Sequence, residues 1–182
     1  MVVTHPGRNH HSTYTGDVAA HSGDVELVIE FLNTFDLEEG TDVLLTRHEW
    51  HAWAHDRHLT PDPLPEAMRL RAGLRAAIGD DTVHIEERPG EQSAVPVGIV
   101  LTEHGPDLTA STAAGAVFAA AARIAIRGDW RRFKICPAHT CRWAFFDNSR
   151  NRSRTWCSMA VCGNREKARA FRKRSGGDAT RP

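Results

Sequence analysis

The feature that most constrains this chain is a 39-residue stretch, from Cys136 to Arg174, that contains all four of its cysteines. They form two close pairs, Cys136-x4-Cys141 and Cys157-x4-Cys162, with fifteen residues between the pairs. Two such pairs can place four thiolates around one metal ion, which is how closed structural zinc sites are built. The sequence therefore predicts one structural Zn²⁺ per chain, with Cys136, Cys141, Cys157 and Cys162 as its ligands.

The segment around the cysteines is too short to fold on an apolar core alone. A unit of about 45 residues with few large apolar side chains needs a metal or disulfides for stability. Structural zinc contributes an apparent ~10–16 kcal/mol in small zinc-finger peptides. We therefore expect this segment to fold only with zinc, while two alternatives stay open: four unrelated buried thiols, or a redox switch in which oxidation releases the metal.

The charge of the chain is divided unequally between its two ends. Residues 1–130 carry nine lysines and arginines against twenty aspartates and glutamates, a net charge of −11, whereas residues 131–182 carry fourteen against three, a net charge of +11. Such an asymmetry indicates a basic module for a polyanion, joined to an acidic part with another role. The acidic half is also expected to mask the basic half until a signal arrives.

The rest of the chain reads as an α+β protein. Apolar spacing and capping residues predict helices from Asp24, from Thr41 or Asp42 and from Pro65, and an Ala-rich helix over about 109–127. The segments 82–87 and 95–102 are rich in β-branched residues and predict a β-hairpin. We expect a mainly helical N-terminal domain with this small hairpin over 21–129, a zinc-stabilised loop and basic helix over 130–174, and flexible tails at 1–20 and 175–182.

Basic residues are arranged for contact with nucleic acid on both sides of the second cysteine pair. The helix predicted after Cys162 places Arg165, Arg169 and Arg172 on one face, with Val161, Ala168 and Phe171 as an apolar stripe that packs. The loop before Cys157 sets arginines among Asn and Ser, which donate to phosphates. The predicted nucleic-acid contacts are Arg150, Arg152, Arg154, Asn164, Arg165, Lys167, Arg169, Arg172 and Lys173.

The segment from about 130 to 174 resembles the CGNR zinc finger, named for the tetrapeptide that is Cys162-Gly163-Asn164-Arg165 here. The four cysteines, the turn FFDNSRN and the run WCSMAVCGNR occur in the family's order. In that family an N-terminal ABATE domain, described as a stress-induced transcription regulator, precedes the finger, and residues 24–128 resemble it more loosely. The resemblance implies a bacterial DNA-binding regulator whose N-terminal domain receives a signal.

A row of histidines in the acidic half is a second candidate site. His48, His51, His55 and His58 lie along one face of the predicted helix beside Trp50. His51 and His55 have a spacing that can chelate a metal, so His48, His51, His55 and Trp50 form a candidate ligand site. The pattern is not H-E-x-x-H, because Ala52 follows His48 by four. A polar helix flank and a pH response are the alternatives.

The sequence predicts a DNA-binding transcription regulator rather than an enzyme. Duplex DNA is the expected partner, since a helix-borne row of arginines suits the major groove. RNA binding and a small metalloenzyme that uses the histidine row are the alternatives. A homodimer and a small-molecule effector are expected further partners. No run of the sequence is long and apolar enough to cross a membrane and no export signal is visible, so we expect the protein in the cytoplasm, on the nucleoid when bound to DNA.

Overall fold

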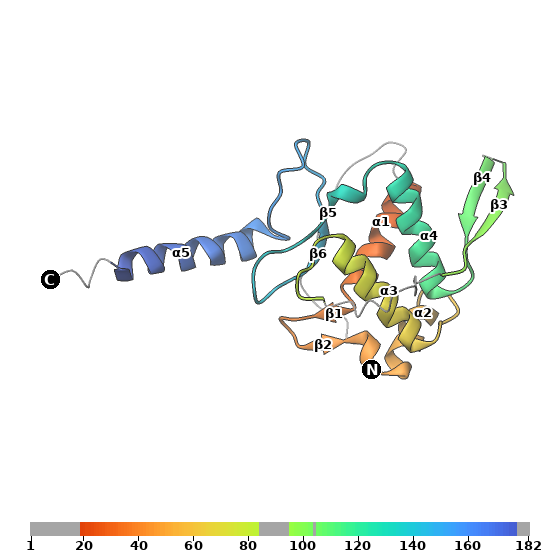
Figure 1. Cartoon of the computed structure of the whole chain (residues 1–182), viewed down its shortest axis with the longest axis horizontal. Coiled ribbons are helices and arrows are strands. Elements are labelled where there is room, and N and C mark those ends of the chain that lie inside the picture. The colour runs from red at the N-terminus through yellow and green to blue at the C-terminus, as the bar shows by residue number, and fades with distance from the viewer. Residues whose placement is uncertain (1–18, 84–94, 104, 178–182) are drawn as a thin grey trace, which may run out of the picture.

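A computed structural model describes residues 19–83, 95–103 and 105–177 (Figure 1). The helices described are α1 (Ala19–Leu32), α2 (Arg47–His55), α3 (Leu64–Ala77), α4 (Ala113–Ile126) and α5 (Asn164–Gly177). Three antiparallel pairs of short strands join them: β1 (Phe35–Asp36) with β2 (Thr41–Asp42), β3 (Gly98–Thr102) with β4 (Gly105–Thr109), and β5 (Phe133–Ile135) with β6 (Ala144–Phe146). The predicted α+β class, with a mainly helical N-terminal part and small hairpins, is confirmed.

Side-chain caps set the starts of two helices. The Thr46 side chain accepts a hydrogen bond from the Glu49 N–H at the start of α2, and Thr112 does the same for Gly115 at the start of α4. Such caps satisfy N–H groups that the first helical turn leaves without partners. Gly115 also permits close packing, since a Cβ there would lie 2.8 Å from both Ala110 Cβ and Thr112 Oγ1.

The main core lies between α1 and α4 and is closed by α2 and α3. Phe31 on α1 meets the rings of Trp50 and Trp53 on α2, and the two indoles stack at 5.3 Å between centroids. Ile124 from α4 is fully buried in the same cluster. The Trp50 indole also donates to the Asp62 carbonyl over 2.8 Å, so burial does not leave its N–H without a partner.

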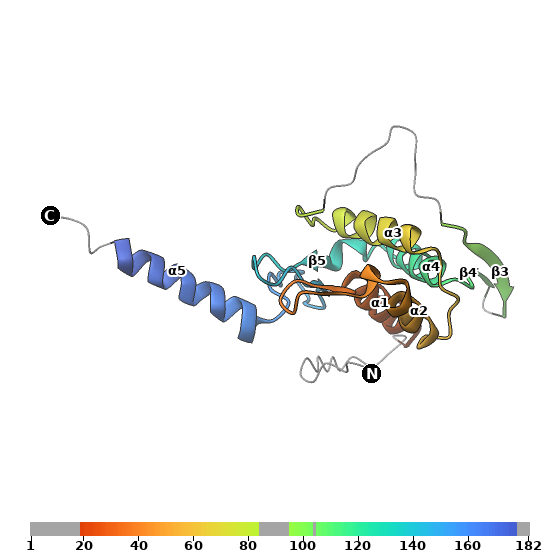
Figure 2. The same cartoon turned by 90° about the horizontal axis from the view of Figure 1, so that it is seen from below.

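One strand of the predicted hairpin has a different partner. The segment 98–102 is a strand, as expected, but it pairs with Gly105–Thr109, so that Val100 lies opposite Asp107. Most of the other predicted strand, 82–87, lies outside the described residues. Because 105–109 is strand, α4 begins at Ala113 instead of near 109. The β3–β4 pair projects from the body beside the start of α4 (Figures 1 and 2).

The core continues across the boundary that we predicted near residue 130. Phe133 of β5 and Phe146 of β6 pack ring to ring at 5.0 Å and belong to the main cluster with α1 and α4. Phe145, the neighbour of Phe146, points to the other side and packs against the cysteines. The β5–β6 hairpin therefore joins the two parts of the chain, and the division into domains at 129–130 stays a prediction.

Helix α5 stands clear of the body (Figures 1 and 2). The predicted apolar stripe on this helix does not pack: Phe171 is 64% exposed, Val161 is 46% exposed and Ala168 is also exposed. That part of the prediction was wrong, because the spacing of these residues matches a helical face but no other element lies against it. The helix ends at Gly177, inside the segment that we expected to be a tail. No helix in the described ranges is both long and apolar enough to span a membrane.

Candidate metal centre and nucleic-acid interface

The four cysteines converge on one buried point. Their Sγ atoms all lie within 4.8 Å of one another, and each side chain is at most 3% exposed. Cys157 Sγ lies 3.5 Å from Cys141 Sγ and 3.6 Å from Cys162 Sγ, and none of the four forms a disulfide. Zinc–sulfur bonds of about 2.3 Å in a tetrahedron place the sulfurs about 3.8 Å apart. The four thiols are therefore positioned to bind one zinc ion, as predicted.

Two tight turns present the sulfurs. In the first pair, Cys141 N–H donates to the Ala138 carbonyl, and Arg142 then adopts a positive φ of 52°. In the second pair, a single π-helical turn, Met159–Gly163, carries Cys162 into the start of α5. The two pairs thus have the same x4 spacing but reach it through different turns.

The pKa values of the thiols depend strongly on one another. Hydrogen bonds from Cys141 and Cys157 lower the pKa of the Cys136 thiol to about 2, whereas hydrogen bonds with Cys136 and Cys141 raise the pKa of Cys157. Burial raises the pKa of Cys162 to about 12. Four thiolates this close repel one another, so the full ligand set needs a cation to balance its charge.

Asp147 organises the loop between the cysteine pairs. Its carboxylate is fully buried and accepts hydrogen bonds from Lys134 Nζ at 2.7 Å, from the hydroxyl and N–H of Ser149, and from the Arg154 N–H. Burial raises the pKa of Asp147, but these hydrogen bonds outweigh it and lower the pKa to about 2. Sequence reasoning missed this role, although an Asp in a polar loop can form a turn in which its carboxylate accepts from the backbone N–H two residues further on, as Asp147 does from Ser149.

The predicted loop arginines separate into two kinds. Arg150 and Arg152 are exposed, as a phosphate contact requires. Arg154 is half-buried, lies 4.9 Å from the centroid of the Phe145 ring, and donates to the carbonyls of Trp156 and Cys157. Arg154 therefore supports the metal site, and its contact with nucleic acid stays a prediction.

The predicted contacts on α5 are exposed. Arg169 pairs with Glu166 over 2.6 Å, and Asn164 donates to the Ala160 carbonyl. Arg165 reaches back to the body, where its guanidinium donates to Glu38 Oε1 at 2.9 Å and to Thr140 Oγ1 at 3.1 Å. The hydrogen bond and charge of Glu38 raise the pKa of Arg165. The remaining predicted contacts, Lys167, Arg172 and Lys173, are exposed along the helix.

The histidine row does not assemble a metal site of three or more ligands. The four cysteines are the only such group in the described parts of the chain. His48 and His55 are exposed on α2, and the rings of His51 and His55 lie 6.4 Å apart. Trp50 is fully buried on the other side of that helix, so the structure separates it from the histidines with which we grouped it.

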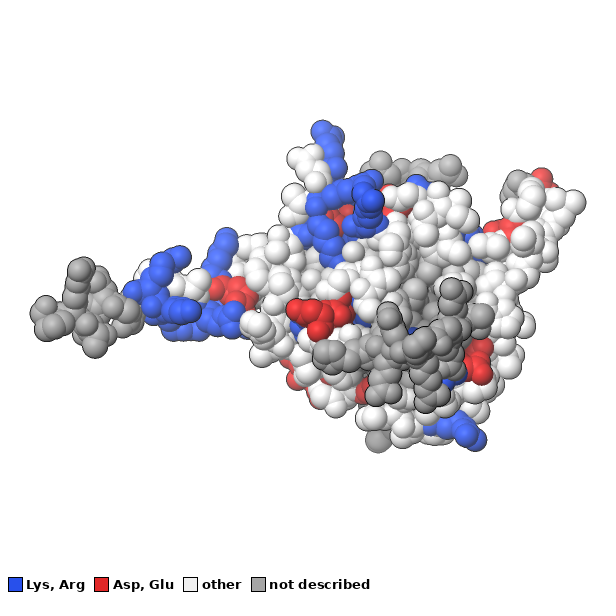
Figure 3. Space-filling view, viewed as in Figure 1, with Lys and Arg blue, Asp and Glu red and all other residues white. Residues whose placement is uncertain are grey.

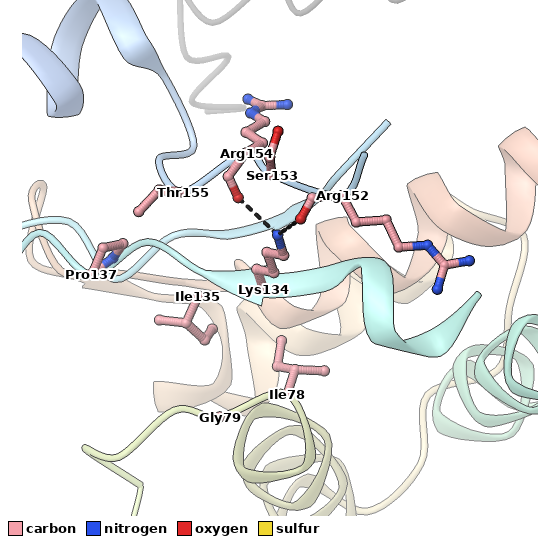
Figure 4. A pocket seen from close by; sticks show the side chains of 9 residues that line it. All are labelled: Ile78, Gly79, Lys134, Ile135, Pro137, Arg152, Ser153, Arg154 and Thr155. Atoms are coloured by element: carbon pink, nitrogen blue, oxygen red, sulfur yellow. Dashed lines mark hydrogen bonds between the residues drawn. The ribbon is translucent and has the colours of Figure 1, made fainter. Parts of the chain in front are cut away.

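We call the segment around the four cysteines, residues 133–163, the metal module. A shallow depression of about 470 Å³ lies where the end of α3 meets this module. Figure 4 shows Ile78 on one side of the depression and Lys134 on the other. The Lys134 ammonium group donates to the carbonyls of Arg152 and Arg154. The guanidinium groups of Arg152 and Arg154 point away from the depression in that view. The depression is therefore lined mainly by apolar side chains and backbone groups rather than by charged groups that face into it.

Comparison with known proteins agrees with the geometry of the cysteines. Residues 132–175 match the family model for the CGNR zinc finger. The match covers the four cysteines, the Asp147 loop and most of α5, so the resemblance of this segment to that finger is confirmed. A search of curated proteins gave no match to the chain. The resemblance of residues 24–128 to the ABATE domain stays a prediction.

Proposed function

We propose that this chain is a zinc-dependent regulator of transcription that binds duplex DNA through α5. The observation that carries the proposal is the exposure of α5: its fourteen residues include six basic side chains and one acidic one, Glu166, and no other described element covers it. A basic helix that stands clear of its domain can enter the major groove, which is wide enough to admit an α-helix.

The zinc site supports this role by fixing where α5 begins. Cys162 lies in the turn directly before Asn164, the first residue of the helix, and Asp147 holds the loop that leads to Cys157. Bound zinc would lock these segments together through its four sulfurs. The helix and its basic side chains would then be presented to DNA in one orientation.

Binding of the zinc-loaded full chain to random-sequence duplexes over a salt series tests the proposal. If about six phosphates are neutralised, the logarithm of the affinity falls with the logarithm of salt concentration at a slope near −5. Selection of bound sequences would then show a preference, and Arg169→Gln should relax it if Arg169 contacts base edges. Binding that does not change with salt would overturn the proposal.

RNA is the alternative ligand for the same basic helix. Competition between duplex DNA and structured RNA at matched salt decides between them. We favour DNA because exposed aromatic side chains, on which single-stranded bases stack, are few near α5: in the described part of the chain only Phe171 lies on that helix.

The metalloenzyme alternative requires a second metal equivalent that is lost in His51→Ala. We propose instead that the chain acts by binding, not catalysis.

A second copy of the chain is the further partner that we propose, because one short helix rarely gives enough specificity alone. The β3–β4 hairpin exposes Ile99 (74%) and Leu101 (83%), and in the described residues β3 pairs only with β4. An open apolar strand edge can pair with the same strand of another copy. Sedimentation should show a dimer that Ile99→Lys/Leu101→Lys dissociates and that Leu45→Lys, at another exposed leucine, does not. A monomeric wild-type chain would overturn this part.

The N-terminal part is proposed to receive the signal, in the cytoplasm. A small-molecule effector bound in the depression beside Ile78 would contact both α3 and the metal module, and so could change how the two fit together. An effector that stabilises wild type but not Ile78→Glu against thermal unfolding would support this site. Equal stabilisation of both proteins would exclude it.

A further inference from the structure

A second group of basic side chains lies apart from α5. Figure 3 shows one cluster of lysine and arginine along α5 and another over the end of α4 and the loop that follows β6. In the sequence the members of the second cluster are far apart, on both sides of the boundary near residue 130. Only two of them, Arg150 and Arg152, were among the contacts that the sequence predicted.

The contacts around Asp129 show how this cluster is assembled. Arg132 Nε lies 2.8 Å and Arg152 Nη2 lies 3.9 Å from Asp129 Oδ1. On the other side, His21 Nε2 lies 3.8 Å from Asp129 Oδ2, and Arg127 Nη1 lies 3.1 Å from His21 Nδ1. Arg132 and Arg152 thus meet at one carboxylate, and Arg127, directly after α4, is linked to it through His21.

The cluster carries more positive charge than its acidic neighbours balance. Exposed Arg131 lies next to Arg132 in the chain and exposed Arg150 lies two residues before Arg152, so the cluster contains five arginines. Asp24 also lies 3.7 Å from Arg127, but its carboxylate already forms a two-point pair with Arg123. Arg127 and Arg152 are 44% and 47% exposed, and so they can reach a ligand without a change of fold.

We propose that Arg127, Arg131, Arg150 and Arg152 form a second phosphate-binding surface, which holds the backbone of the same DNA duplex that α5 enters. Arginine binds phosphate oxygens in a two-point geometry and stays charged at all physiological pH values. A surface of this kind fixes the register of a protein on the duplex without reading its sequence. This inference rests on the proposed function, since it takes the polyanion to be duplex DNA.

The double variant Arg127→Gln/Arg131→Gln of the zinc-loaded full chain tests this surface. Both residues lie outside the predicted contact set, and neither is among the donors that hold the Asp147 loop, unlike Arg132, which donates to the Asp147 carbonyl. We expect the double variant to weaken binding to all duplex sequences alike and to reduce the salt slope by about 1 per arginine. The matched control, Arg47→Gln/Arg69→Gln, removes the same charge from exposed positions on α2 and α3 and should change neither.

Two outcomes would overturn the inference. The first is that Arg127→Gln/Arg131→Gln binds DNA with the affinity and salt slope of the wild type. The second is that the control Arg47→Gln/Arg69→Gln changes both quantities equally, because the effect would then be one of net charge. Arg169→Gln/Arg172→Gln on α5 separates this inference from the proposed function. If that variant alone loses binding, the function stands and the second surface fails. If the Arg127/Arg131 variant alone loses binding, the second surface stands and the role of α5 fails.

Discussion

The side chain of Asn33 forms two hydrogen bonds with the backbone of Ala144: Nδ2 donates to the carbonyl at 2.9 Å, and Oδ1 accepts from the N–H at 2.8 Å. Asn33 follows α1 and Ala144 begins β6, so this pair joins the N-terminal part to the strand that leads out of the first cysteine turn. The amide takes the place of a neighbouring strand.

Asn33→Ala should therefore destabilise the whole chain. Loss of both hydrogen bonds would leave the Ala144 N–H and carbonyl unpaired at a buried position, a cost of about 1–3 kcal/mol. Urea unfolding of the zinc-loaded chain measures this cost. Asn148→Ala, at an exposed asparagine, is the matched control and should change the free energy of unfolding by less than about 0.5 kcal/mol. Equal stabilities of the two variants would contradict the role of Asn33.

Zinc removal should unfold the metal module but leave the main core. Trp143 and Trp156 pack against the cysteines, whereas Trp50 and Trp53 lie in the core between α1 and α2. On chelation, NMR signals from the indoles of Trp143 and Trp156 should move to unfolded positions, while those of Trp50 and Trp53 stay dispersed. The chelator loaded with zinc beforehand should change none of them. Retention of all four native signals after chelation would show that the metal does not hold the module.

Asp80 should make stability depend on acid pH. It is buried between Arg75 and Arg142, whose guanidinium groups lie 2.6 Å and 2.7 Å from it. Burial raises the pKa of Asp80, but hydrogen bonds from Arg142 and Thr82 and the charge of Arg75 outweigh it and lower the pKa to about 2. Because the folded pKa lies below the unfolded one, the stability that Asp80 contributes is complete above about pH 4 and is lost as the pH falls toward 2.

The comparison of Asp80→Asn with the wild type isolates this effect. The change leaves Arg75 without its buried carboxylate and Arg142 with Asp81 alone, which should cost about 3–5 kcal/mol at pH 7. The difference in unfolding free energy between the two proteins should shrink between pH 4 and pH 2, and acid release of zinc affects both and cancels. A difference that stays constant down to pH 2 would show that Asp80 does not titrate in this range.

Glu38→Gln should tighten DNA binding. Glu38 holds the Arg165 guanidinium against the body, so its neutral amide would release that side chain for the duplex. We expect the affinity to rise by about two- to fivefold at low salt, the range expected for an exposed ion pair. Glu39→Gln, the adjacent acidic residue, removes the same charge and is the control. An equal gain in both variants would mean that net charge, and not release of Arg165, causes it.

The sequence predicted the features that local spacing determines. The zinc ligands followed from two cysteine pairs. The starts of α2 and α4 were each predicted too early, because Asp42 caps only the short 3-10 turn Val43–Leu45, whereas Thr46 and Thr112 cap the two helices. Strand β4 could not be foreseen, since Gly-Pro-Asp-Leu-Thr has low strand propensity and is held by backbone pairing with β3.

Long-range contacts were also beyond the sequence. The pairing of Asn33 with Ala144 joins positions 111 apart, and the approach of Arg152 to Asp129 and of Arg127 to His21 depends on how β5 and β6 pack on the core. On α5 the sequence predicted a contact that the structure does not have, because the spacing of Phe171 and Ala168 indicated a buried face and both residues are exposed. Periodicity shows which residues share a face of a helix, and only the tertiary fold decides whether anything covers it.

The exposure of α5 has a consequence for how that helix stays formed. An isolated helix of fourteen residues is marginal in water, mainly because its first turn is costly to nucleate. Here the π-helical turn that carries Cys162 is continuous with the first turn of α5, so the metal-binding residues can serve as a ready-made nucleus. Fraying should then run in one direction only, from Gly177 back toward Asn164, and hydrogen exchange along the helix should slow steadily toward the cysteine.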